Sequence, residues 1–172
     1  MTRRVRSWIE ALIWLLCIYA SIPFVRPLCE ALRQMALLNI TIFSSTFILA
    51  GLFIRSLGDK KRRQPLTWIL IVLAVLFYVY GFYVVTIPEE RLHFIQYGVL
   101  AFLVHRALCE DIKITFYGYL HAFLLTSAFG WLDEGIQAVT PGRFYSLGDV
   151  LLNSISAVLG LFVTFIGRQK YP

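Results

Sequence analysis

The sequence predicts an all-α fold, a polytopic bundle of about six transmembrane helices with the N- and C-termini in the cytoplasm. Apolar residues make up 59% of the 172 residues, and charged residues make up 15%, whereas soluble domains have about 25%. The charges also fall in short connections between long apolar runs. A chain this short has too little interior to hide so much apolar surface from water, so we expect lipid to cover the rest.

Six segments qualify as spans, because a helix needs about 20 mostly apolar residues to cross a bilayer. The third is the clearest, since it carries no charge, and the second is the weakest, since Asn, Ser and Thr dilute it. The first is predicted to span rather than to be cleaved as a leader, because residues 18–22 form a poor small-residue cleavage site. The predicted spans are Trp8–Val25, Leu37–Ile54, Leu66–Thr86, Leu92–Leu108, Ile114–Leu132 and Leu147–Ile166.

The basic residues predict the orientation of these spans. With the N-terminus inside, six crossings place 12 Lys and Arg at the inner surface and four at the outer surface, as cytoplasmic enrichment in Lys and Arg requires. If the second segment did not cross, the cluster Lys60–Arg63 would lie outside. The outer four are Arg26, Arg33, Arg91 and Arg143, and the inner twelve are Arg3, Arg4, Arg6, Arg55, Lys60, Lys61, Arg62, Arg63, Arg106, Lys113, Arg168 and Lys170.

The acidic residues gather at the opposite, outer surface, in three short patterned groups. The first group begins at Pro88, which suits the first turn of a helix. Glu89 and Glu90 follow at the positive end of the helix dipole. His93 lies four and three residues later and shares their face, and Tyr97 continues this face one turn deeper.

The second and third groups lie where the fifth span ends and the sixth begins. Asp133 and Glu134 would face the negative end of the helix dipole, so they need a cation, a proton or a hydrogen-bond donor, and Arg143 is the nearest cation. Gln137 shares a face with both carboxylates. In the third group Ser146 can cap the helix, and Asp149 follows three residues later, at the spacing of a capping box. Asn153 lies four residues after Asp149 and shares its face.

Structural alternatives stay open for every group. Asp149 can be only a cap, His93 only a packed core residue, and the other acids only a solvated helix start or a hydrogen-bonded network. The three cysteines are scattered without metal-binding spacing, and Gly-rich phosphate loops, HExxH and GxSxG are missing from the sequence. We expect no cofactor and assign no metal site, although carboxylates at the outer surface would suit Mg²⁺ or Ca²⁺.

Together the three groups resemble the VanZ-like family of bacterial membrane proteins. The resemblance covers about Pro88 to Gly160, with Glu90-Arg91-x-His93-Phe94-x-x-Tyr97-x-x-Leu100, then Asp133-Glu134-x-x-Gln137-x-x-x-Pro141-Gly142-Arg143, then Ser146-x-x-Asp149-x-x-x-Asn153. The family often has Lys at the position of Arg91 and Gly near Ser156, so this chain keeps the charge of that lysine but not its chemistry. The resemblance divides the chain into an N-terminal pair of helices at 1–65, with a basic cytoplasmic loop, and a four-helix VanZ-like domain at 66–172.

The resemblance implies a multi-pass protein of the bacterial inner membrane, from a family whose namesake is associated with resistance to the glycopeptide teicoplanin.

Our leading hypothesis is an outward-facing site that binds or alters a lipid-linked or cell-envelope molecule. A non-enzymatic structural protein and a small transporter are the alternatives, and whether the chain is an enzyme stays open. We expect membrane lipids as partners and no nucleic acid, with homo-oligomers an open alternative. The candidate acid–base residues are His93, Asp133 and Glu134, and the candidate substrate-binding residues are Arg91, Tyr97, Gln137, Arg143, Asp149 and Asn153.

Overall fold

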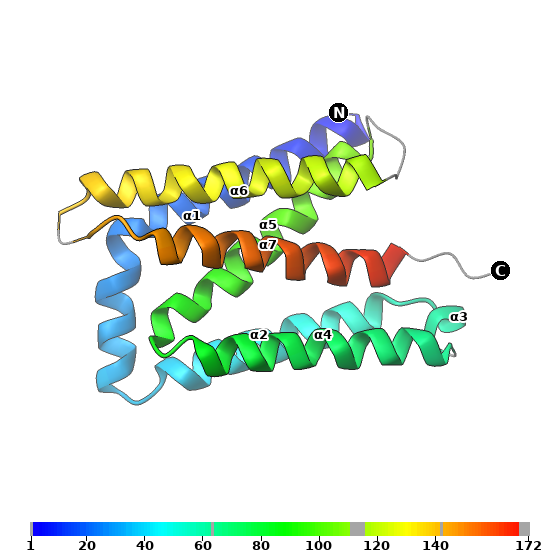
Figure 1. Cartoon of the computed structure of the whole chain (residues 1–172), viewed down its shortest axis with the longest axis horizontal. Helices are drawn as coiled ribbons and strands as arrows, with labels where there is room; N and C mark the ends of the chain where they lie inside the picture. Colours follow the sequence, from blue (N-terminus) through cyan, green and yellow to red (C-terminus); the bar gives the residue numbers. More distant parts are fainter. Residues whose placement is uncertain (1, 63, 111–115, 142, 169–172) are drawn as a thin grey trace.

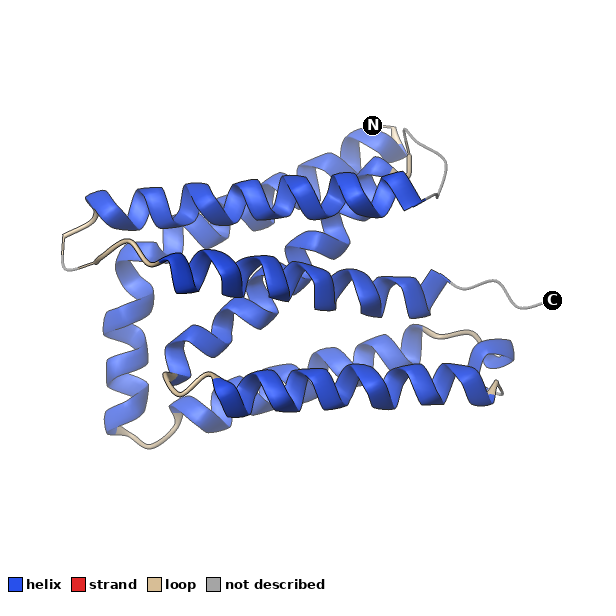
Figure 2. Cartoon of the chain, in the orientation of Figure 1, coloured by secondary structure: helices blue, strands red, loops and turns tan. Residues whose placement is uncertain are grey.

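The computed structural model describes residues 2–62, 64–110, 116–141 and 143–168, and in these residues the chain is helical, with no strand. The described residues form six long helices, so the all-α prediction is confirmed. Figures 1 and 2 show that most of these helices run along one axis, while one crosses the others diagonally. The elements are α1 (Arg3–Gln34), α2 (Leu38–Ser56), the short α3 (Asp59–Arg62), α4 (Pro65–Val84), the 3-10 turn η1 (Pro88–Arg91), α5 (Leu92–Leu108), α6 (Phe116–Val139) and α7 (Leu147–Arg168).

Four of the described helices, α1, α2, α4 and α7, are long and apolar enough to cross a membrane. Large apolar side chains are exposed along α2 and α4, including Phe47, Ile69 and Val79, and lipid is the environment in which such a surface is stable. The chain is therefore a membrane protein. Helix α5 is not among these four because it has only 17 residues, whereas α6 is longer but carries polar residues, including Asp133, Glu134 and Gln137 in its last turns.

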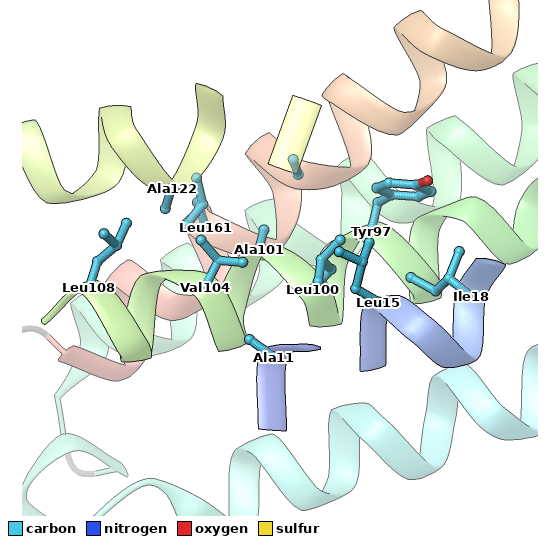
Figure 3. Close-up of a cluster of buried hydrophobic side chains, with 11 residues drawn as sticks. Ala11, Leu15, Ile18, Tyr97, Leu100, Ala101, Val104, Leu108, Ala122 and Leu161 are labelled. Atoms are coloured by element: carbon cyan, nitrogen blue, oxygen red, sulfur yellow. The ribbon is translucent and has the colours of Figure 1, made fainter. Parts of the chain in front are cut away.

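Helix α5 is the centre of the bundle. It crosses diagonally behind α7 and contacts α1, α6 and α7 (Figure 1). Its residues Tyr97, Leu100 and Ala101 are fully buried in an apolar cluster with side chains of α1, α6 and α7, including Leu15 and Leu161 (Figure 3). The short α5 thus needs less lipid-facing apolar surface than its neighbours.

Two glycines allow α5 and α7 to approach closely. A Cβ atom on Gly160 would lie 2.6 Å from the Cα atom of Gly98, which real Cβ atoms do not tolerate. Small residues commonly mark such close crossings between membrane helices. This crossing holds the first turns of both helices at the same end of the bundle.

Helix α1 is longer than the predicted span, since it continues beyond Val25 to Gln34. Pro23 and Pro27 lie inside it, and the helix turns there so that its last part runs across the end of the bundle (Figure 1). We call residues 23–34 the α1 arm. Helix α6 also runs beyond its predicted end at Leu132, to Val139, so Asp133, Glu134 and Gln137 are helical; the predicted start of this span, Ile114, lies outside the described residues.

Candidate functional site

A cavity of about 610 Å³ opens at the end of the bundle that the α1 arm crosses. The arm, η1 and the first turns of α5 and α7 surround it together with the last turns of α6. Apolar side chains such as Ile18, Ile22 and Leu92 line part of the wall. The polar and charged residues in the wall are Ser21, Arg26, Glu30, Arg33, Thr86, Glu89, Glu90, His93, Gln96, Asp133, Gln137, Arg143 and Asp149.

Asp133 is the most deeply buried carboxylate in this wall, with 2% of the residue exposed. One carboxylate oxygen, Oδ2, accepts a hydrogen bond of 2.8 Å from the hydroxyl of Tyr97. The other oxygen, Oδ1, is buried and has no hydrogen-bond partner among the described residues. A buried acceptor without a partner costs about 1–3 kcal/mol, so Oδ1 favours any donor that enters the cavity.

His93 also lines the cavity and carries a second buried polar atom. Only 8% of the residue is exposed, and its Nδ1 atom has no partner in the part of the chain that the structure describes. Its ring stacks on that of Tyr97, with centroids 6.0 Å apart. Tyr97 therefore positions both His93, through its ring, and Asp133, through its hydroxyl, while lying outside the cavity wall itself.

Glu90 and Asp149 bring further negative charge to this wall from η1 and from the first turn of α7. Burial raises the pKa of Glu90, and the nearby charges of Asp149 and Glu89 raise it further. The backbone N–H of Asp149 donates to the Ser146 hydroxyl at 3.2 Å, which confirms the predicted N-cap. Capping thus uses the side chain of Ser146, and the Asp149 side chain faces the cavity.

Glu134 has a different environment from its neighbour Asp133. It is fully buried and does not line the cavity. Its Oε1 atom accepts a bond of 3.0 Å from Gln137, and its Oε2 atom accepts one of 3.1 Å from the backbone N–H of Ser146. Arg143 donates through Nε, at 3.0 Å, and through Nη2 to the amide oxygen of Gln137. Arg143 thus reaches Glu134 through Gln137, and this chain of bonds holds the connection between α6 and α7.

The two remaining candidate residues, Asn153 and Arg91, lie beside the cavity. Asn153 is fully buried one turn below Asp149, and its side-chain amide donates to the Gly130 carbonyl at 3.5 Å. Arg91 faces α2 instead, because it donates to the Val85 carbonyl at 3.1 Å and to the Asn39 side chain at 3.2 Å. The structure therefore brings His93, Asp133, Gln137, Arg143 and Asp149 to one cavity and places Tyr97, Glu134, Asn153 and Arg91 around it.

The sequence interpretation did not include the α1 arm in the site. Arg26, Glu30 and Arg33 come from the arm, and Arg33 forms an ion pair with Glu89 of η1. The spacing of these three residues, four and then three, places them on one helical face, and two prolines precede or interrupt them. That combination is the signal that could have predicted a bent helix with a polar face.

Within the described residues, His, Cys, Asp and Glu side chains do not form a group of three that could hold a metal ion. Comparison with models of protein families, with curated proteins and with solved structures found no match to this chain. The chemistry of the cavity is therefore the guide to its function: buried acceptors, guanidinium groups and apolar side chains share its wall.

Proposed function

We propose that this chain is a six-span, VanZ-like protein of the bacterial inner membrane, and that its cavity binds the polar part of a cell-envelope molecule at the outer surface. The cavity wall is both apolar and charged, which suits an amphipathic or lipid-linked ligand. The single observation that carries the proposal is that two residues of one cavity wall, His93 and Asp133, each hold a buried polar atom, Nδ1 and Oδ1, that has no partner among the described residues. A ligand that hydrogen-bonds to both would offset their cost of burial.

The arrangement of the helix ends supports the six-span topology. The start of α1, the basic α3 region and the end of α7 lie at one end of the bundle, and the α1 arm and the start of α7, which line the cavity, lie at the other (Figure 1). Arg3, Arg6, Arg62 and Arg168 are at the first end, which suits the cytoplasmic surface. The cavity then opens to the outer surface, where envelope molecules are found.

Ligand retention tests this proposal directly. We expect the protein, extracted with its native lipids, to retain an envelope amphiphile that native mass spectrometry detects. The variants His93→Ala and Asp133→Asn should lose at least about tenfold in occupancy, because the first removes a buried polar partner and the second replaces a carboxylate with an uncharged amide. The control His121→Ala changes an exposed histidine of α6 that bonds to the Tyr117 carbonyl, and it should retain the amphiphile. Equal occupancy in all four proteins, or no amphiphile in the wild type, would contradict the proposal.

A structural role is the second candidate, and the bonds around Glu134 favour it. The bonds that Glu134 accepts from Gln137 and Ser146 join α6 to the start of α7, as interhelical polar contacts do in many membrane proteins. Under this alternative, His93→Ala and Asp133→Asn lower the amount of folded protein and leave ligand retention per folded molecule unchanged.

From the resemblance alone, we also propose a role in resistance to glycopeptide antibiotics. The variant Arg143→Ala in a teicoplanin susceptibility assay tests this role.

A further inference from the structure

We propose that the cavity selects a molecule that carries a primary ammonium group, with Asp133 as its main partner. The inference rests on the proposed function and names the chemical class of the ligand. It depends on three observations: the balance of charge in the wall, the buried carboxylate oxygen of Asp133 that has no partner among the described residues, and the lack, in those residues, of a compact group of metal ligands.

The charged residues in the wall are more often acidic than basic. Five carboxylates and three guanidinium groups line the cavity. Arg33 is paired with Glu89, and Arg143 is bonded to Gln137. With all groups ionised the described wall carries a net charge of −2, so the cavity attracts a cation.

The deepest groups match the hydrogen-bonding capacity of an ammonium. A primary ammonium has three N–H donors and no acceptor, whereas an ionised carboxylate only accepts. Asp133 lines the cavity, and its Oδ1 atom is buried without a protein donor in the described chain, while Tyr97 bonds to the other oxygen. His93 Nδ1 can accept a second bond when it is unprotonated, and Glu90 and Asp149 add negative charge from η1 and α7.

The spacing of these groups favours an organic cation over a metal ion. A calcium ion takes six to eight oxygen ligands at about 2.3–2.6 Å, and a magnesium ion needs tight octahedral geometry. The described side chains do not bring three such ligands together. An ammonium on a flexible carrier can instead bond to one acceptor at close range and interact with the other acids at longer range.

The same ammonium chemistry is available from a lipid headgroup or from a soluble amine. The test therefore uses the protein in nanodiscs of phosphatidylglycerol that contain phosphatidylethanolamine and phosphatidylcholine in equal amounts. Phosphatidylcholine keeps the glycerophosphate but replaces all three N–H groups with methyl groups. We expect native mass spectrometry to show at least about tenfold preferential retention of phosphatidylethanolamine over phosphatidylcholine in the wild type.

Two variants and one control make the test specific. Asp133→Asn should abolish the preference, so that the two lipids are retained about equally. Glu90→Gln, at the cavity wall, should reduce the preference partly. Each variant removes a negative charge that faces the ligand. The control Asp59→Asn removes a carboxylate from the exposed α3 at the opposite end and should keep the full preference. If Asp133→Asn is not folded, Glu90→Gln alone decides the outcome.

A second experiment adds soluble ethanolamine to the protein in nanodiscs that lack phosphatidylethanolamine. Saturable binding that Asp133→Asn abolishes supports a soluble amine, and binding of the lipid alone supports a headgroup. Equal retention of the two lipids without ethanolamine binding would overturn the inference. If the wild type still retains an amphiphile from native membranes, the proposed function stands without the ammonium preference; if it retains none, both fail.

Discussion

The hydroxyl of Tyr97 donates a 2.8 Å hydrogen bond to Oδ2 of Asp133, and this bond joins the first turns of α5 to the last turns of α6. Tyr97 is fully buried, so its hydroxyl finds its partner in the protein rather than in water. The other oxygen of this cavity-lining residue, Oδ1, has no hydrogen-bond partner within the described part of the chain. The geometry of the site therefore depends on a residue that does not line it.

Replacing Tyr97 with Phe should destabilise the protein by about 1–3 kcal/mol, because it removes the donor to a buried carboxylate. For a chain of this length, each kcal/mol lowers the melting temperature by roughly 2–4 °C, which a thermal unfolding scan in detergent measures. The control Tyr83→Phe changes a tyrosine that is 82% exposed on α4 and should not change the melting temperature. Equal melting temperatures for both variants would show that the Tyr97 bond contributes nothing.

Gly160→Ala should separate α5 from α7 and cost about 1–3 kcal/mol or more, because the added methyl group meets the backbone of Gly98 rather than a movable side chain. Folded yield and the melting temperature measure the effect. Gly51→Ala is the matched control, since nothing lies within 4 Å of a Cβ at that position of α2. A melting temperature for Gly160→Ala as high as that of the control would contradict the close crossing.

Reversing one charge of the Arg33–Glu89 pair should loosen the α1 arm. Arg33 is exposed and Glu89 is half-buried, so we expect a loss of no more than about 1 kcal/mol. Hydrogen exchange of the arm amides should speed up in Arg33→Glu and in Glu89→Arg. It should return toward the wild-type rate in the double variant, which restores opposite charges. Arg55→Glu, at the end of α2, is the control, and equal exchange in all these proteins would argue against an anchoring role for the pair.

Glu90→Gln should stabilise the protein at neutral pH but not at acidic pH. The pKa of Glu90 is raised above its ordinary value of 4.5, first by burial and then by the charges of Asp149 and Glu89, so the folded protein binds this proton more tightly than the unfolded chain. Stability is therefore lost as the pH rises from 4.5 through the raised pKa. The melting temperature of Glu90→Gln should exceed that of the wild type at pH 7, and the difference should vanish at pH 4. A constant difference across this range would exclude ionisation of Glu90 as the cause.

Labelling of single cysteines tests the orientation. In a variant with Cys17, Cys29 and Cys109 replaced by Ser, a cysteine at Lys61 should react with a membrane-impermeant maleimide only after the cells are opened. A cysteine at Val139, which is 82% exposed at the end of α6, should react in intact cells. Labelling of position 61 from outside would overturn the proposed six-span topology.

Much of the fold could be predicted because helices that contact lipid need long apolar segments, which are visible in the sequence. The predicted span Leu92–Leu108 coincides with α5, and the predicted start of the sixth span at Leu147 coincides with the start of α7. The N-cap at Ser146 followed from local hydrogen-bonding chemistry. The bend of α1 was missed because the residues after Pro23 remain mostly apolar until Arg26, and proline marks a break without giving its direction.

The local order of residues is enough to predict a helical membrane protein whose polar groups lie at helix ends. Which of these polar groups share a cavity depends on how the helices pack. Asp133 and Glu134 are adjacent, yet each residue of a helix is rotated by about 100° from the one before it. Asp133 therefore faces the cavity and Tyr97, and Glu134 faces the connection to α7. Packing of the neighbouring helices, which no local pattern encodes, selects the face that becomes the site.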